Sequence, residues 1–574
     1  MTVSSVLTVV LSLSVFAFEN EPADLVVHHA KVVTVDSQFR IAEAFAVRGE
    51  RIVAVGSDDE VMKLVGPKTQ VLDLKGRTLL PGLMDSHTHP TGAAMYEFDH
   101  PIPEMETIAD VLKYIEQRVA VAEEGDWIGI SQVFVTRLRD QRFPNRNELD
   151  RVAPKNPVIF STGPDSAVNS LALKLSGIDK DFKITDGQPG YLEKDPQSGE
   201  LTGILRSCSR LIKSKSKSKS ATEAERLDRL KQMMTAYNAV GLTSISDRNA
   251  GDDAINLFAK LHAEKSLTCR VFFSYAINAQ DPVDKIEERL KKAAAHPLHA
   301  KNDWLWLRGV KCFLDGGMLT GSAYMREPWG VSTIYGITDP AYRGLLYIPA
   351  DKLKSIARLS FDNGLQFTAH TVGDGAVHSL VEAYEAINRD LPLRDHRPCI
   401  THCNFMSREA IDRMKAVGIV ADLQPAWLRL DGATLLKQFG EQRTEYFQPY
   451  RTLFEQGVVV GGGSDHMQKF GSVRSINPYN PFLGMWITLT RQPRWAERPL
   501  HPEQLISREQ ALRLYTTNNA FVMFAEKEKG SIEVGKLADF IVLDRDYMTC
   551  PINEVADINV RQTFVAGKQV FVSE

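Results

Sequence analysis

Residues 79–90 read LLPGLMDSHTHP, an apolar run that ends in two histidines one residue apart. Alternate side chains of a β-strand share one face, so His87 and His89 can converge on a single metal ion, and Asp85 has the same parity. On its own, this pattern is equally typical of two solvated or core histidines. The rest of the chain must therefore distinguish a metal site from ordinary histidines.

Four more polar residues follow apolar runs of the kind expected for barrel strands: Lys311, His370, His402 and Asp465. A (β/α)8 barrel uses about 31 residues for each unit of strand and helix. The interval from His370 to His402 matches one such unit, and the interval from His402 to Asp465 matches two. The interval from Lys311 to His370 matches one unit with an extended loop.

Strand candidates at 243–246 and 271–274 place Lys311 on the fourth strand if the strand with His87 is the first. The candidate residues then fall on strands one, four, five, six and eight. Because the carboxyl ends of all barrel strands meet at one mouth, these side chains are expected to lie together there. The interval between His89 and Thr243 exceeds one unit by about 120 residues. This excess predicts an insertion, at about residues 95–240, that lies over the mouth.

Both ends of the chain carry short alternating strands, at 23–74 and 540–572, which would keep unpaired edges unless they formed one β unit. We therefore predict an α/β protein that contains a TIM-like (β/α)8 barrel, a β-sandwich domain built from both termini and a large insertion after the first barrel strand. The predicted boundaries are 1–19 for a signal peptide, 20–80 for the N-terminal part of the β-sandwich domain, 81–499 for the barrel, and 500–574 for the last helix and the C-terminal part of the β-sandwich domain.

The composition is that of a globular chain, with 574 residues, 43% hydrophobic and 24% charged, and a formal net charge of −4. This charge offers no basic surface to nucleic acid, which we exclude as a partner. The segment 1–18 carries no charged side chain and is apolar from Val6 to Phe18, which favours a signal peptide and export to the periplasm or the medium. The alternatives are a lipid-tethered segment and an irregular N-terminus of a cytoplasmic protein, and no stretch predicts a stable membrane span.

The motifs at 80–90, 309–317, 369–377, 463–465 and 530–543 together resemble those of the amidohydrolase superfamily, and within it of amidohydrolase family 3. The resemblance covers nearly the whole chain after Ala23. It implies a TIM-like barrel with a metal centre that hydrolyses amide or related bonds. The segment 163–170 departs from many family members, because no histidine precedes Asn169 and Ser170 there, so the substrate-binding residues stay unassigned.

Carried over to this sequence, the resemblance implies a binuclear metal centre. His87 and His89 would hold the more buried metal, His370 and His402 the more exposed one, and Asp465 would touch the buried metal and act as the catalytic proton acceptor. An ammonium group has no lone pair, so Lys311 would bridge the two ions as a carboxylated lysine, formed with carbon dioxide. The alternative is an unmodified lysine that pairs with Asp315 or stabilises an oxyanion. The donor set suits two zinc ions, and also manganese, iron or nickel.

The function implied by this resemblance is hydrolysis of carbon–nitrogen bonds other than peptide bonds, in a small amide, formamide or acylated amine. An ester or lactone hydrolase is the alternative among enzymes, because activated water attacks either carbonyl. A metal-bearing binding protein without catalysis is the alternative from another class. The expected partner is a small-molecule substrate, and a homo-oligomer is left open.

Overall fold

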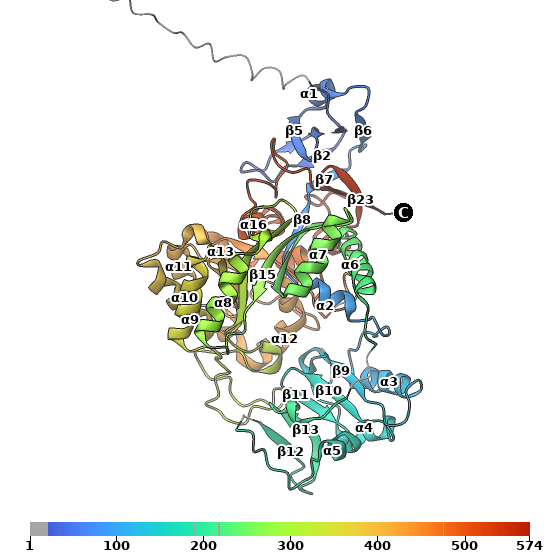
Figure 1. Ribbon diagram of the computed structural model, residues 1–574, viewed down its shortest axis with the longest axis vertical. Helices are drawn as coiled ribbons and strands as arrows, with labels where there is room; N and C mark the ends of the chain where they lie inside the picture. The colour runs from blue at the N-terminus through green and yellow to red at the C-terminus, as the bar shows by residue number, and fades with distance from the viewer. Residues whose placement is uncertain (1–20, 132, 188–189, 216–218, 475, 574) are drawn as a thin grey trace, which may run out of the picture.

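The computed structural model describes residues 21–573, apart from 132, 188–189, 216–218 and 475. Three bodies follow one another along the long axis of the molecule (Figure 1). A β-rich module from both chain ends lies at one pole, the barrel lies in the middle, and the inserted segment lies at the other pole. The signal peptide expected at 1–19 lies outside the described residues. Within the described part of the chain, no helix is long and apolar enough to cross a bilayer.

The central body is a sheet of eight parallel strands that curls into a nearly closed barrel. In sheet order the strands are β8 (Leu83–Thr88), β14 (Leu242–Ala250), β15 (Arg270–Ala276), β16 (Leu305–Phe313), β17 (Gln366–Thr371), β18 (Cys399–His402), β19 (Val420–Leu423) and β20 (Val460–Gly462). Across the seam between β20 and β8, the Asp465 amide donates to the His87 carbonyl at 2.7 Å, and the His89 amide donates to the His466 carbonyl at 2.8 Å. The predicted barrel is confirmed, and Lys311 lies on its fourth strand.

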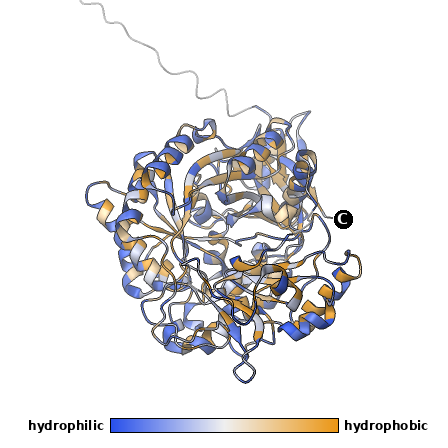
Figure 2. Cartoon of the chain, turned by 60° about the horizontal axis from the view of Figure 1, so that its bottom comes forward, coloured by the Kyte–Doolittle hydropathy of each residue, from blue (hydrophilic) through white to orange (hydrophobic). Residues whose placement is uncertain are grey.

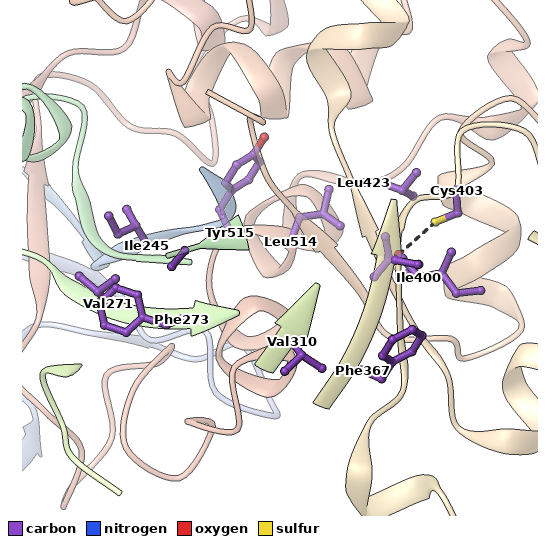
Figure 3. Close-up of a cluster of buried hydrophobic side chains, with 14 of the residues drawn as sticks. Ile245, Val271, Phe273, Val310, Phe367, Ile400, Cys403, Leu423, Leu514 and Tyr515 are labelled. Carbon is purple, nitrogen blue, oxygen red and sulfur yellow. Dashed lines mark hydrogen bonds between the residues drawn. The ribbon is translucent and has the colours of Figure 1, made fainter. Parts of the chain in front are cut away.

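Helices cover the outside of the barrel, and their ribbons carry both hydrophilic and hydrophobic residues (Figure 2). They are α2 (Pro90–Met95), α6 (Glu223–Asn238), α7 (Asp252–Ala263), α8 (Val283–Ala294), α9 (Ala350–Asp362), α10 (Asp374–Asn388), α11 (Arg408–Val417), α13 (Tyr450–Glu455), α14 (Pro481–Thr490), α15 (Arg508–Leu514) and α16 (Thr517–Val522), while α12 (Pro425–Thr444) lies between the barrel and the inserted segment (Figure 1). Figure 3 shows part of the core that these helices share with the strands, where Ile245, Phe273, Val310 and Phe367 are fully buried. This packing fixes the strands whose ends carry the site.

The β-rich module combines strands from both termini, as predicted. One sheet has the order β5-β4-β1-β6 and the other the order β23-β22-β21-β7-β2-β3. Their bounds are β1 (Leu25–His28), β2 (Lys31–Val33), β3 (Ile41–Ala42), β4 (Ala44–Arg48), β5 (Arg51–Gly56), β6 (Gln70–Asp73), β7 (Thr78–Pro81), β21 (Phe540–Leu543), β22 (Val560–Val565) and β23 (Lys568–Val572). Asp539, just before β21, pairs with the buried Arg270 of β15 at 2.7 Å and ties the module to the barrel.

The segment between β8 and α6 forms a mixed five-stranded sheet of order β12-β13-β11-β10-β9 with its own apolar core. Its elements are α3 (Ile108–Val119), β9 (Ile128–Ser131), α4 (Arg146–Val152), β10 (Val158–Thr162), β11 (Asp165–Val168), α5 (Ser170–Ser176), β12 (Tyr191–Lys194) and β13 (Leu201–Arg206). It faces the barrel through α12, which lies between the two bodies in Figure 1. A buried ion pair from Arg137 to Asp431 of α12, 2.7 Å long, joins them.

Candidate metal centre and active site

The carboxyl ends of β8 and β20 bring together three of the residues selected from the sequence. His87 and Asp465 are buried and His89 is partly exposed. Asp465 Oδ1 lies 3.4 Å from His87 Nε2 and 3.2 Å from His89 Nε2. One ligand atom from each of the three residues lies within 4.8 Å of the others. The structure thus gathers these side chains around one point.

The spacing of these atoms fits a shared metal ion. Two ligand atoms about 2.1 Å from a tetrahedral ion are about 3.4 Å from each other, close to both observed separations. His87 Nε2 is buried without a hydrogen-bond partner, which is costly for a polar atom unless another group satisfies it. Burial also holds the pKa of His87 well below its usual range, so that the imidazole is neutral and keeps a lone pair. The donor set therefore fits a divalent transition metal.

His370 and His402, at the ends of β17 and β18, form the other side of the site. Their ring centroids are 4.4 Å apart, and the His402 ring stacks on the His87 ring at 4.9 Å. Burial lowers the pKa of His370 to about 3 and that of His402 well below its usual range. Both rings are therefore neutral near pH 7 and have lone pairs for a metal.

Lys311 of β16 lies in the same region, with a side chain that is almost fully buried. Burial lowers the pKa of its ammonium group to about 8, although the charges of Asp465 and Asp422 oppose that shift. About one lysine in ten is then neutral at pH 7, far more than for a lysine in water. All six residues selected from the sequence therefore lie at one mouth.

Two residues that sequence reasoning did not assign hold the histidines in place. Asp422 of β19 has its Oδ2 3.4 Å from His87 Nδ1, and Gln424 Nε2 lies 3.5 Å from the same nitrogen. Because a carboxylate only accepts, the closer contact favours the His87 proton on Nδ1. The His402 Nδ1 donates to the Gln424 Oε1 at 2.7 Å. Both contacts leave Nε2 of the ring free to bind metal, as outer partners of metal-binding histidines usually do.

Asp85 does not join the metal ligands, although its parity on the strand suggested that it would. Its Oδ1 accepts from the backbone amides of His87 at 2.9 Å and Ser464 at 3.0 Å. The carboxylate thus ties the turn after β20 to β8. Strand parity alone failed here because these backbone amides capture the side chain before it can reach the site.

Arg248 of β14 lies inside the barrel and is fully buried. Its guanidinium donates to the Ser86 carbonyl at 3.0 Å and to Ser274 Oγ at 3.1 Å, and its Nε lies 3.7 Å from Asp422 Oδ2. This cation balances the charge of Asp422 behind His87. Neither residue could be found from the sequence, because neither belongs to a recognisable motif: Asp422 lies in an apolar run and Arg248 in a polar one.

A cavity of about 310 Å³ opens in front of the site, between the barrel and the insertion. It is about twice the size of the ~150 Å³ cavity that takes up benzene in another protein. Its polar lining includes His370, Asp465 and Asn477. The rest is mainly apolar, with Phe134 and Pro164 from the insertion and Phe313, Met318, Leu319, Tyr347, Trp427 and Met467 from the barrel side. The lining also includes the carboxyl group of Asp315. Among the described lining residues there is no lysine or arginine, so none of them would pair with a negatively charged group of a bound molecule.

The barrel with histidines and a carboxylate at its mouth has the fold of metal-dependent hydrolases. An uncharacterised metal-dependent hydrolase from Pyrococcus furiosus matches with a TM-score of 0.65, 20% identity and coverage of 92% of this chain and 100% of that one. Another from Pyrococcus horikoshii OT3 matches with a TM-score of 0.67, 19% identity and coverage of 92% and 99%. These likenesses establish the fold, and the sequence comparisons establish the family.

A sequence profile of the amidohydrolase family matches residues 70–571, and the chain belongs to this family. N-substituted formamide deformylase from Arthrobacter pascens is 29% identical, over 95% of this chain and 97% of that protein. Protein LONG AFTER FAR-RED 3 from Arabidopsis thaliana is 26% identical, over 96% of this chain and 92% of that protein. The family resemblance inferred from the motifs is confirmed, and the protein is a hydrolase of the amidohydrolase superfamily.

Proposed function

We propose that this protein is a metal-dependent hydrolase that cleaves a carbon–nitrogen bond, other than a peptide bond, in a small amide, formamide or acylated amine. The observation that carries the proposal is the group of His87, His89 and Asp465, whose ligand atoms face one another at the edge of an apolar cavity. The relative that acts on N-substituted formamides supports a formamide or an acylated amine as the substrate class.

Some residues of the site are proposed to bind the metal, and Asp465 is proposed to transfer the proton. A divalent metal bound here would polarise the scissile carbonyl and make water acidic enough to lose a proton near neutral pH. His87 and His89 would bind it through Nε2, and His370 and His402 would bind a second ion. Asp465 accepts the proton of the attacking water and passes it to the leaving nitrogen, which departs as a neutral amine. The apolar cavity walls exclude other water from the reacting carbonyl.

Lys311 is proposed to carry a carboxyl group and to bridge the two ions. Its neutral amine attacks carbon dioxide, a carbon–nitrogen bond forms, and one proton leaves the nitrogen to give an anionic carbamate. Burial favours the neutral amine that this step requires. Removal of bicarbonate during metal loading should therefore lower the metal content of the wild type, whereas a Lys311→Ala variant should show no such dependence. Equal loading of the wild type with and without bicarbonate would contradict the carbamate.

The test of the function uses pairs of substrates that differ only at the scissile bond. Metal-loaded protein is given N-substituted formamides, other small acyl amides and the esters of the same acyl groups, and amine or alcohol release is measured. Amide turnover should fall by at least about a hundredfold in Asp465→Asn, with a smaller loss of metal content. Turnover of esters alone would replace the proposal with an esterase. If the fully metal-loaded protein turned over no substrate, the remaining interpretation would be a metal-bearing binding protein without catalysis.

We also propose that the N-terminal segment 1–19 directs export. The support is its apolar, nearly uncharged sequence. The test is to recover the protein from the periplasm or medium of the cells that produce it and to determine its N-terminal residues. A start near residue 20 supports cleavage and export, and an intact Met1 in the cytoplasm refutes it.

A further inference from the structure

The backbone of Asp465 is held in an unusual conformation. Its φ is +55°, in the left-handed region that a residue with a side chain rarely adopts because it is strained there. Two hydrogen bonds oppose this strain. The Asp465 amide donates to the His87 carbonyl at 2.7 Å, and the Asp465 carbonyl accepts from Asn477 Nδ2 at 2.7 Å. The direction of the Asp465 side chain thus depends on Asn477, which lies 12 positions further along the chain.

Asn477 also reaches the carboxylate itself. Its Nδ2 lies 3.3 Å from Asp465 Oδ2, while Asp465 Oδ1 faces the two histidines. The same amide group therefore holds both the main chain and the side chain of Asp465. Asn477 is buried and lines the cavity in front of the site.

The insertion holds Asn477 in turn. Arg137 donates through Nη1 to the Asn477 Oδ1 at 3.2 Å and to the Ile476 carbonyl at 2.6 Å. Its Nε and Nη2 bind both oxygens of Asp431 at 2.9 and 2.7 Å, so the guanidinium is fixed in one orientation. Trp427 Nε1 donates to the same Asn477 oxygen at 3.2 Å. The contacts run without a gap from the inserted segment to Asp465.

We infer that Asn477 is a positioning residue for Asp465 and that Arg137 makes the alignment of the catalytic carboxylate depend on the docked insertion. The inference rests on the proposed function. Other contacts already attach the insertion to the barrel, among them the bond from Gln141 Nε2 to Thr434 Oγ1 at 2.9 Å. The two further bonds of Arg137 instead hold residues 476 and 477, the segment that orients Asp465. The insertion is therefore part of the active site as well as a cover over it.

The test begins with Asn477→Asp, which has nearly the same shape. The new carboxylate can still accept from Arg137 and Trp427, but it cannot donate to Asp465 and repels its charge. The inference expects kcat to fall about ten- to hundredfold, with KM changed less than about threefold, and the metal dissociation constant to rise about tenfold in competition with a chelator. Arg137→Ala should lower kcat similarly, and added guanidinium should restore part of it.

Arg137→Lys provides a second variant if Arg137→Ala does not fold, since lysine keeps the charge beside Asp431 but lacks the planar fork. The matched control is Arg206→Ala, which removes another buried arginine of the insertion, one that pairs with Asp165 at 3.2 Å rather than with the segment that holds Asp465. It should keep kcat and metal affinity. Folded Asn477→Asp and Arg137 variants with kcat and metal affinity within twofold of the wild type would overturn the inference. If the wild type hydrolyses no amide, the proposed function fails, and metal affinity alone still tests the positioning.

Discussion

Replacement of Asp422 by asparagine should weaken metal binding, because Asp422 contacts the ring of His87 on the side away from Nε2. Its Oδ1 accepts from Ser86 Oγ at 2.6 Å and from Gln424 Nε2 at 3.2 Å, so the carbonyl oxygen of the new amide takes that position. The amide nitrogen then replaces Oδ2 and faces His87 Nδ1 at about the observed 3.4 Å. A donor there favours Nδ1 as the acceptor and moves the ring proton to Nε2, the atom that should bind metal.

The expected size of this effect follows from the usual contribution of outer partners to metal sites. Their loss costs about ten- to hundredfold in affinity, or about 1.4–2.8 kcal/mol. The assay is zinc competition with a chelating dye near neutral pH, on wild type and variant shown by circular dichroism to be folded at the assay temperature. Asp539→Asn is the control, because it disturbs another buried carboxylate, paired with Arg270 away from the site. An Asp422→Asn affinity within twofold of the wild type would refute the reasoning.

Three further predictions follow from the buried charges and bases. Burial lowers the folded-state pKa of His370 to about 3, so the stability that its neutral form supports is present above about pH 6.5 and is lost as the pH falls from there toward 3. Urea unfolding of the metal-free protein should therefore show that the free energy of unfolding falls from pH 7 to pH 5, and His370 should contribute about 2 kcal/mol to that fall. The fall should be smaller in His370→Asn, and an equally large fall in this variant would contradict the prediction. Arg270→Met leaves Asp539 buried and unpaired and should lower the free energy of unfolding by about 3–5 kcal/mol, seen as an earlier denaturant midpoint, whereas an unchanged midpoint would mean that the pair adds nothing. Asp465→Asn should lower kcat by more than it lowers metal occupancy, measured by initial rates and elemental analysis on the same sample, and a proportional loss of both would assign Asp465 to metal binding alone.

The barrel and the candidate ligands could be predicted because they leave local signals. Each ligand follows an apolar run, and the intervals between ligands are close to multiples of one barrel unit, as with the interval from His370 to His402. The motifs around these positions then identified the family, which the profile match confirms. The regular spacing of the barrel units could thus be predicted from the sequence.

The network around the ligands could not be predicted, because it depends on contacts between segments far apart in the sequence. Asp422 of the seventh barrel strand contacts His87 of the first strand. Arg137 of the insertion donates a hydrogen bond to Asn477, which lies beyond the last barrel strand. Single polar residues in apolar runs give no sign of such partners. Asp85 shows the opposite error, since its place on the strand suggested a ligand and its carboxylate instead binds backbone amides.

A second group of possible ligands affects how metal content must be measured. His28, His29 and Asp73 lie near one another on the surface of the β-rich module. His29 is already paired there with Asp73 at 3.2 Å and Asp58 at 3.5 Å, which accounts for its position without a metal. A variant with both histidines replaced by alanine removes any contribution of this group to the metal count.

The central claim is that the barrel mouth holds a hydrolytic metal centre, and its most direct test is metal content per chain by elemental analysis. The protein is purified without chelator, with bicarbonate present, alongside the surface-histidine variant and His87→Ala. The account predicts about two metal ions per chain in the first two proteins and a clear loss in His87→Ala. About one ion in the wild type would contradict the binuclear centre with a carboxylated Lys311. No bound metal, even after reconstitution with zinc or manganese, would contradict the claim itself.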